Sequence, residues 1–150
     1  MEPLSVAASI IGILAAAGKV AEIVQPLVSS SAVASQLARQ VYNEVSSIRT
    51  VLTSLKAVLQ DLATPLGRAN ARACYVQIDS LVVLFTDGTL LFSELEALLQ
   101  PFKLPATGTV QLLFRERALW VKRKNEIVNS ISRMQRFLTA LSALLNIFQW

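Results

Sequence analysis

The sequence predicts an all-α fold, and three observations support this prediction. Leu, Ala, Val, Ser and Gln dominate the chain, and most of them suit helices. Apolar residues recur at spacings of three and four, whereas the 5 Gly and 5 Pro fall mostly where a helix could stop. With 53% hydrophobic and 16% charged residues, the 150-residue chain can bury one core. We therefore expect a single domain over residues 1–150, folded as one antiparallel bundle of about five to six helices.

The first predicted helix covers about residues 3–24. Pro3 suits the first turn, and Pro26 is expected to end the helix because proline lacks a backbone N–H. Residues 3–18 carry no charge. A secretory signal peptide starts with positive residues, but the only charged side chain before Leu4 is that of Glu2; the AAA at 15–17 imitates a cleavage site, so this alternative stays open.

A membrane-spanning role for this first helix is marginal by length. A transmembrane helix needs about 20 apolar residues, and reaching that length takes in Lys19 and Glu22, of which Lys19 could snorkel to the interface. Ala8, Gly12 and Ala16 form a ladder of small residues that permits close helix contact in lipid. The same ladder suits tight packing in a water-soluble core, so periodicity alone does not decide.

Three further helices are expected between the SSS at 29–31 and about residue 99. The second helix carries a long apolar stripe of Leu37, Val41, Val45, Ile48, Leu52, Leu55, Leu59 and Leu62. Thr64, Pro65 and Gly67 should close this helix. The third runs from about 68 to 85 and the fourth from about 88 to 99, because the TDG at 86–88 resembles a tight turn or a sharp kink. QPFKLPATGT at 100–109 is expected to be a loop.

The last third of the chain should contain a short fifth helix over 110–121 and a long final helix. The final helix repeats apolar residues with alternating spacings of four and three, a heptad seam made by Ile127, Ile131, Met134, Leu138, Leu141, Leu145 and Phe148. We expect this seam and the stripe of the second helix to pack in one bundle, with Leu138, Leu141 and Leu145 buried. An intermolecular coiled coil is the minor alternative.

Composition argues against an enzyme. The chain has no His and one Cys, which excludes Ser/His/Asp triads, Cys/His dyads and ordinary zinc sites within it. Its glycines form no phosphate-binding motif, and the one close pair of carboxylates, Glu94 and Glu96, would point to different sides of a helix. Cys74 is expected to be a buried reduced thiol in a cytosolic protein. We expect no catalytic residue, cofactor or metal.

Positive charge concentrates in the C-terminal third of the chain. Residues 103–150 hold 8 Lys and Arg against 2 Asp and Glu, whereas residues 1–102 hold 6 against 8. The segment RERALWVKRK predicts a basic patch around an aromatic residue, formed by Arg115, Arg117, Trp120, Lys122, Arg123 and Lys124. Such a patch suits an anionic lipid surface; nucleic acid is not expected because no reading motif accompanies the charge. A solvated helix junction is the alternative.

The two ends of the chain resemble a known family. Three features carry the resemblance: MEPLS followed by an apolar run (Glu2, Pro3, Leu4, Ser5), Trp120 with Lys122 and Lys124, and the Leu141 to Ile147 run. Together they are similar to the HeLo-like N-terminal domains of fungal STAND (NOD-like receptor) and ankyrin-repeat proteins. The resemblance implies a helical effector domain without catalytic residues, related in architecture to the four-helix bundle of the necroptosis pseudokinase. It also implies a nucleotide-binding or ankyrin-repeat region downstream.

By this resemblance, the domain is cytoplasmic at rest, forms a homo-oligomer when activated, and moves to the plasma membrane to permeabilise it in regulated cell death. Anionic lipids are the expected partners. The expected membrane-insertion segment contains Pro3, Leu4, Ala8, Ile11, Gly12, Leu14 and Ala16. The alternative function is a helical interaction or oligomerisation module that does not touch lipid.

Overall fold

The computed structural model describes residues 3–30, 35–62, 72–102 and 110–149 of the chain; some side chains within these ranges, among them those of 3–7, 72–80 and 110–117, lie outside the description. The described residues form four α-helices: α1 (Pro3–Ser30), α2 (Ser35–Leu62), α4 (Arg72–Leu99) and α5 (Val110–Gln149). A 3-10 turn, η1 (Gln100–Phe102), follows α4. The prediction of an all-α bundle is confirmed, whereas the count of five to six helices is wrong for this part of the chain.

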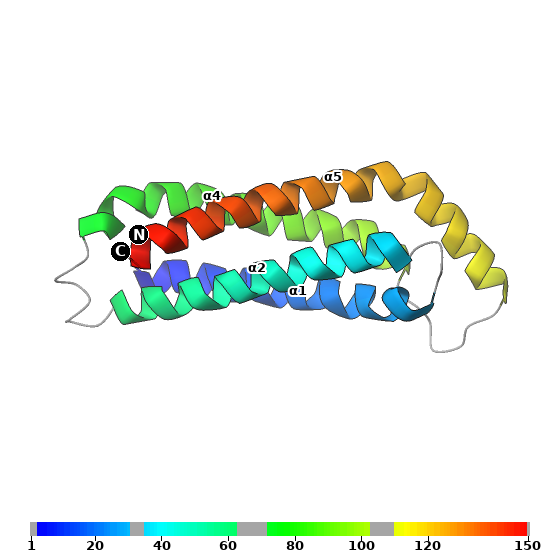
Figure 1. Cartoon of the computed structure of the whole chain (residues 1–150), viewed down its shortest axis with the longest axis horizontal. Coiled ribbons are helices and arrows are strands. Elements are labelled where there is room, and N and C mark those ends of the chain that lie inside the picture. The colour runs from blue at the N-terminus through cyan, green and yellow to red at the C-terminus, as the bar shows by residue number, and fades with distance from the viewer. Residues whose placement is uncertain (1–2, 31–34, 63–71, 103–109, 150) are drawn as a thin grey trace.

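The four helices lie side by side in an elongated bundle (Figure 1), in which successive helices run in opposite directions. Helix α1 packs against α2 and α4, and α5 packs against the same two helices. Consequently α2 and α4, although successive among the described helices, lie diagonally across the bundle. Two antiparallel pairs, α1 with α2 and α4 with α5, therefore stack so that α1 runs parallel to α4 and α2 parallel to α5.

The core follows the predicted apolar stripes closely. In α2, Val41, Val45, Ile48, Leu52, Leu55 and Leu59 are all buried. In α5, Ile127, Ile131, Met134 and Leu141 are buried, whereas Leu138 and Leu145 are only partly buried and pack against the core. Leu138 and Leu145 are therefore less buried than predicted. The residues one position earlier, Phe137 and Leu144, are buried in their place. The stripe widens because α5 packs against both α2 and α4.

The first helix continues past the proline that was expected to end it. Helix α1 includes Pro26 and ends at Ser30, not near Val24. Proline has no N–H to donate a backbone hydrogen bond to the carbonyl of the residue four earlier, here Glu22. Pro26 and Glu22 are both exposed, so this carbonyl lies on the side of α1 that faces water. The next residue, Leu27, is fully buried. Burial of Leu27 therefore stabilises one further turn of α1 beyond the predicted end.

The expected turn at TDG is also wrong, since α4 runs unbroken from Arg72 to Leu99. Among the described residues no glycine has a positive φ, so Gly88 adopts no left-handed turn conformation. It serves close packing instead. A Cβ built on Gly88 would lie 2.6 and 2.7 Å from two ring atoms of Phe137 in α5, and 3.4 Å from Ile13 Cδ1 in α1. The missing side chain lets the three helices approach one another.

The two C-terminal helices expected from the sequence are one. Helix α5 is continuous over its 40 residues. Residues 110–149 contain neither Gly nor Pro, so nothing in this segment interrupts the backbone hydrogen bonds of a helix. The expected end of a helix at about residue 99 is confirmed, but Gln100–Phe102, which were expected to begin a loop, form η1. The closing residues Thr64, Pro65 and Gly67, and residues 103–109, lie outside the described residues.

Candidate functional site

Helix α1 has one buried face and one apolar face that points outward. Its buried residues include Ile10, Ile13, Ala17, Val20, Val24 and Leu27, which contribute to the core. On the outer face, Ala8, Ile11, Gly12 and Ala15 are exposed, and Ile11 keeps 50% of its surface accessible. The first charged residue on this face is Lys19. The outer face is therefore uncharged over its first two turns of described side chains.

The predicted ladder of small residues lies mainly on this outer face. Ala8 and Gly12 are exposed, and Ala16 is half-buried. A Cβ on Gly12 would meet no atom within 4 Å. Close packing inside the bundle therefore does not explain Gly12. Leu14 packs against the core from a half-buried position, and the side chains of Pro3 and Leu4 lie outside the described residues.

Among the described residues, one segment is long and apolar enough to cross a membrane, Ala8–Val28 of α1, with a mean hydropathy of 1.5. Its 21 residues would span about 32 Å as a helix, close to the roughly 30 Å of a hydrocarbon core. Buried core helices of water-soluble proteins meet the same criterion, and 44% of this window is buried in the bundle. Length and composition alone therefore do not assign the segment to a membrane.

The basic cluster lies on the first half of α5. Lys122 and Lys124 are exposed, whereas Arg123 between them is partly buried and its Nη1 donates a hydrogen bond of 3.0 Å to the carbonyl of Leu98. Leu98 is in the last turn of α4, where carbonyl groups have no partner within the helix. Arg123 thus caps α4 and leaves the two lysines pointing to either side.

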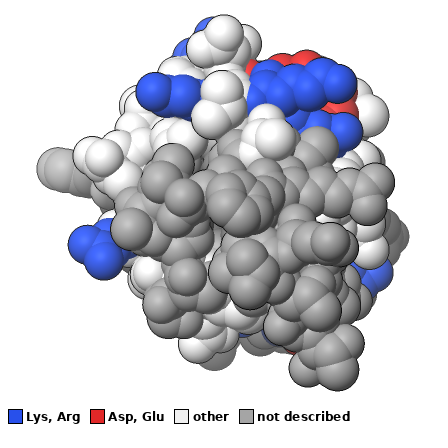
Figure 2. Space-filling view, turned by 90° about the vertical axis from the view of Figure 1, so that its right-hand side faces the viewer, with Lys and Arg blue, Asp and Glu red and all other residues white. Residues whose placement is uncertain are grey.

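The remaining cluster members follow the register of the same helix. Residues seven apart lie on one side of a helix, so position 115 aligns with Lys122 and position 117 with Lys124. The side chains of Arg115, Arg117 and Trp120 lie outside the described residues. Figure 2 shows the bundle from the end that carries this half of α5: Lys and Arg side chains line part of the upper rim, with Asp and Glu beside them. A lipid-binding role for the cluster stays a prediction.

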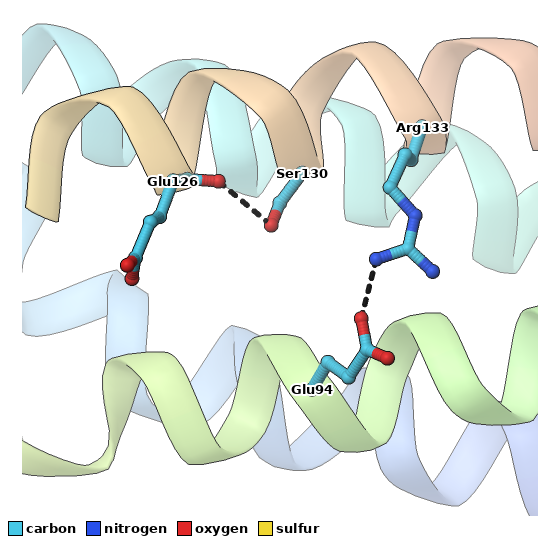
Figure 3. A network of polar contacts seen from close by, with 4 residues as sticks. All are labelled: Glu94, Glu126, Ser130 and Arg133. Carbon is cyan, nitrogen blue, oxygen red and sulfur yellow. Dashed lines mark hydrogen bonds and ion pairs between the residues drawn. The ribbon is translucent and has the colours of Figure 1, made fainter.

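Polar contacts between α4 and α5 were not foreseen from the sequence. Arg133 of α5 forms an ion pair with Glu94 of α4 (Figure 3), and both side chains are substantially exposed. Ser130 is a buried polar residue, and its hydroxyl donates a hydrogen bond of 3.0 Å to the carbonyl of Glu126 in the same helix. No signal in the sequence alone pairs residues 94 and 133, because their proximity depends on how α4 and α5 are aligned.

The described residues contain no group of three or more His, Cys, Asp or Glu that could hold a metal ion. The side chain of Cys74 lies outside the description. Comparisons with protein-family models, with curated proteins and with solved structures each found no match to the chain.

Proposed function

We propose that the chain is a HeLo-like effector domain that permeabilises membranes: it is stored as a water-soluble cytoplasmic bundle, oligomerises on activation, and inserts α1 into an anionic plasma membrane to execute regulated cell death. The observation that carries this proposal is the two-faced apolar character of α1. Ile11, with Ala8, Gly12 and Ala15 on the same side, presents an uncharged face to water, opposite the face of α1 that packs in the core. An amphipathic bundle helix would carry polar residues there.

The charges of α1 explain why storage is the resting state. Lys19 lies near the middle of Ala8–Val28, and a lysine at the centre of a membrane helix opposes insertion by about 2.5 to 3.5 kcal/mol. Insertion of the charge-free residues 3–18 instead covers about 24 Å of a hydrocarbon core of roughly 30 Å, so the Lys19 side chain must snorkel over the remaining few ångströms to reach the interface. Leaving the bundle exposes the buried face of α1. Contacts with lipid and with other copies would have to compensate for that loss.

The exposed lysines of α5 would supply the first attraction to the membrane. Each cation near an anionic surface contributes about 1 kcal/mol, so Lys122 and Lys124 together contribute about 2 kcal/mol. Both side chains are exposed, so they need not leave any contact in the core to meet lipid headgroups.

Vesicle flotation tests this attraction. Wild type should float with anionic vesicles at low salt and less at high salt, because salt screens exposed charges. Replacing both lysines by Glu (Lys122→Glu, Lys124→Glu) should abolish flotation while circular dichroism stays helical. The matched control is Arg39→Glu with Arg49→Glu, which reverses two exposed positive charges on α2. Flotation of the folded lysine variant at the level of wild type would contradict the role of the cluster.

A second function is favoured by a different observation. Val83 and Leu90, on the outer surface of α4, are 63% and 53% exposed. Because they are seven residues apart, Val83 and Leu90 lie on the same side of α4, and exposed apolar side chains that form one patch mark contacts with other proteins. A helical oligomerisation module that never touches lipid would use such a surface. The same flotation experiment separates the two functions, because this second module would ignore anionic vesicles at every salt concentration.

A further inference from the structure

A hollow of about 350 Å³ opens on the surface between α4 and α5. Phe137 of α5 forms part of its floor, and Leu84 and Leu90 of α4 line one side. Leu90 stands half exposed at this site, and Val83, seven residues earlier in α4, extends the same side of the helix. This surface, which we call the α4–α5 groove, therefore combines a depression with protruding apolar side chains.

The two sides of the α4–α5 groove carry opposite charges. The α4 side bears Asp87 and Glu94, and the α5 side bears Arg133 and Arg136. Glu94 and Arg133 join the two sides through their ion pair (Figure 3). Asp87 and Arg136 both line the hollow and both are exposed. The groove is thus acidic along one helix, basic along the other and apolar between them.

This separation of charge is complementary to itself. In a two-fold contact, the same patch meets its own copy, so every attractive pair occurs twice. A two-fold axis that runs along the α4–α5 groove, parallel to the helices, places α4 of one copy over α5 of the other. Asp87 of each copy then faces Arg136 of the other, and Leu90 of each copy faces the other hollow.

We propose that the α4–α5 groove is the surface through which two copies of this chain associate, with the two-fold axis along the groove. The inference rests on the oligomerisation step of the proposed function and names its surface. Asp87 and Arg136 set the orientation of the pair, whereas Leu90 provides apolar contact. A surface of a single sign would repel its own copy, but this one attracts it on both sides of the axis.

Mixing two charge variants tests the proposal. In Asp87→Arg, positions 87 and 136 are both basic, and in Arg136→Asp they are both acidic. Each variant alone should repel its own copy and sediment as a monomer. An equimolar mixture should form a heterodimer, because both cross pairs are then attractive. Analytical ultracentrifugation should show at least about a tenfold weaker self-association for each variant than for wild type and recovery in the mixture.

An apolar pair of variants provides the control. Leu90→Ser should reduce dimer formation at least about tenfold, whereas Val121→Ser, at a position that is 72% exposed and outside the groove, should leave it unchanged. The proposal is overturned if wild type stays monomeric up to about 1 mM, the weak end of transient association. It is also overturned if the mixture behaves as the sum of two monomers.

Vesicle flotation of the same variants separates this inference from the proposed function. Leu90→Ser should still float with anionic vesicles, because Lys122 and Lys124 are intact. Loss of dimer formation with retained flotation supports a distinct association surface. If wild type dimerises through the groove but never floats with vesicles, the proposed membrane function is wrong, whereas the assignment of the groove as the association surface is supported.

Discussion

Replacing Gly88 by Ala should destabilise the bundle, although Gly to Ala in a helix is normally favourable. The added methyl carbon would lie 2.6 Å from Phe137 Cζ, about 1 Å inside an ordinary carbon–carbon contact. Phe137 is buried and packs edge-on against Phe92 with ring centroids 6.4 Å apart, so the ring can move away from the methyl group only toward the surface hollow between α4 and α5. Overpacking of this kind costs about 1 to 3 kcal/mol, against a gain of about 1 kcal/mol in helix propensity, so the net loss relative to wild type is about 0 to 2 kcal/mol.

The matched control is Gly18→Ala. Gly18 also lies inside a helix, but a Cβ there would meet no atom within 4 Å. Both substitutions gain about 1 kcal/mol of helix propensity, so the difference between them isolates the packing cost. We expect Gly18→Ala to be more stable than wild type, and Gly88→Ala to be about 1 to 3 kcal/mol less stable than Gly18→Ala.

Urea unfolding followed by circular dichroism measures both values, and an unchanged slope shows that the transitions are comparable. The double variant Gly88→Ala with Phe137→Leu should lose less stability than the two single changes added together, because the smaller side chain leaves room for the methyl group. If Gly88→Ala matched or exceeded Gly18→Ala in stability, the close approach of α4 and α5 at this position would be refuted.

Two further stability predictions follow from the same helices. Leu141→Ala should cost about 2 to 5 kcal/mol, because Leu141 is fully buried; a loss below about 0.5 kcal/mol in urea unfolding would place the residue on the surface. Arg123→Ala should cost about 1 kcal/mol, because the Leu98 carbonyl loses its donor, whereas Lys122→Ala should be neutral; equal melting temperatures for the two variants would argue against the cap.

Much of the fold was predictable because it depends on local periodicity. The stripe of α2 identified six residues that are fully or almost fully buried, and Leu99 ends α4 where the sequence suggested a loop. Two of the errors arose at Pro26 and Gly88, where a residue that often stops a helix lies inside one. In both cases a tertiary contact decides: burial of Leu27 continues α1, and the Phe137 ring requires the space that Gly88 leaves.

The candidate site was predictable only in part. Sequence spacing grouped the cations of residues 115–124, but it could not show that Arg123 caps α4, because that bond joins residues 25 apart in the chain. The α4–α5 groove was missed altogether, since it depends on which sides of two helices meet. Ile11 of the expected insertion segment is half exposed in the bundle, which the sequence did not indicate and which makes it a useful probe.

Dye release from anionic liposomes tests the central claim most directly. Ile11→Lys should oppose insertion of α1 by about 3 to 4 kcal/mol, the cost of the lysine plus the lost isoleucine, which corresponds to at least about a hundredfold. The fold should survive, because Ile11 is half exposed in the bundle. Gly12→Leu keeps α1 apolar but blocks close approach of neighbouring copies, at a position with open space in the monomer.

Val121→Lys is the matched control, since it adds the same charge at an exposed apolar position outside α1. All variants must first be shown to be helical and monodisperse. We predict that wild type and Val121→Lys release dye, whereas Ile11→Lys and Gly12→Leu release much less. If wild type releases no dye, or if Ile11→Lys and Gly12→Leu release as much as wild type, α1 is a structural helix only and the membrane-insertion account is wrong.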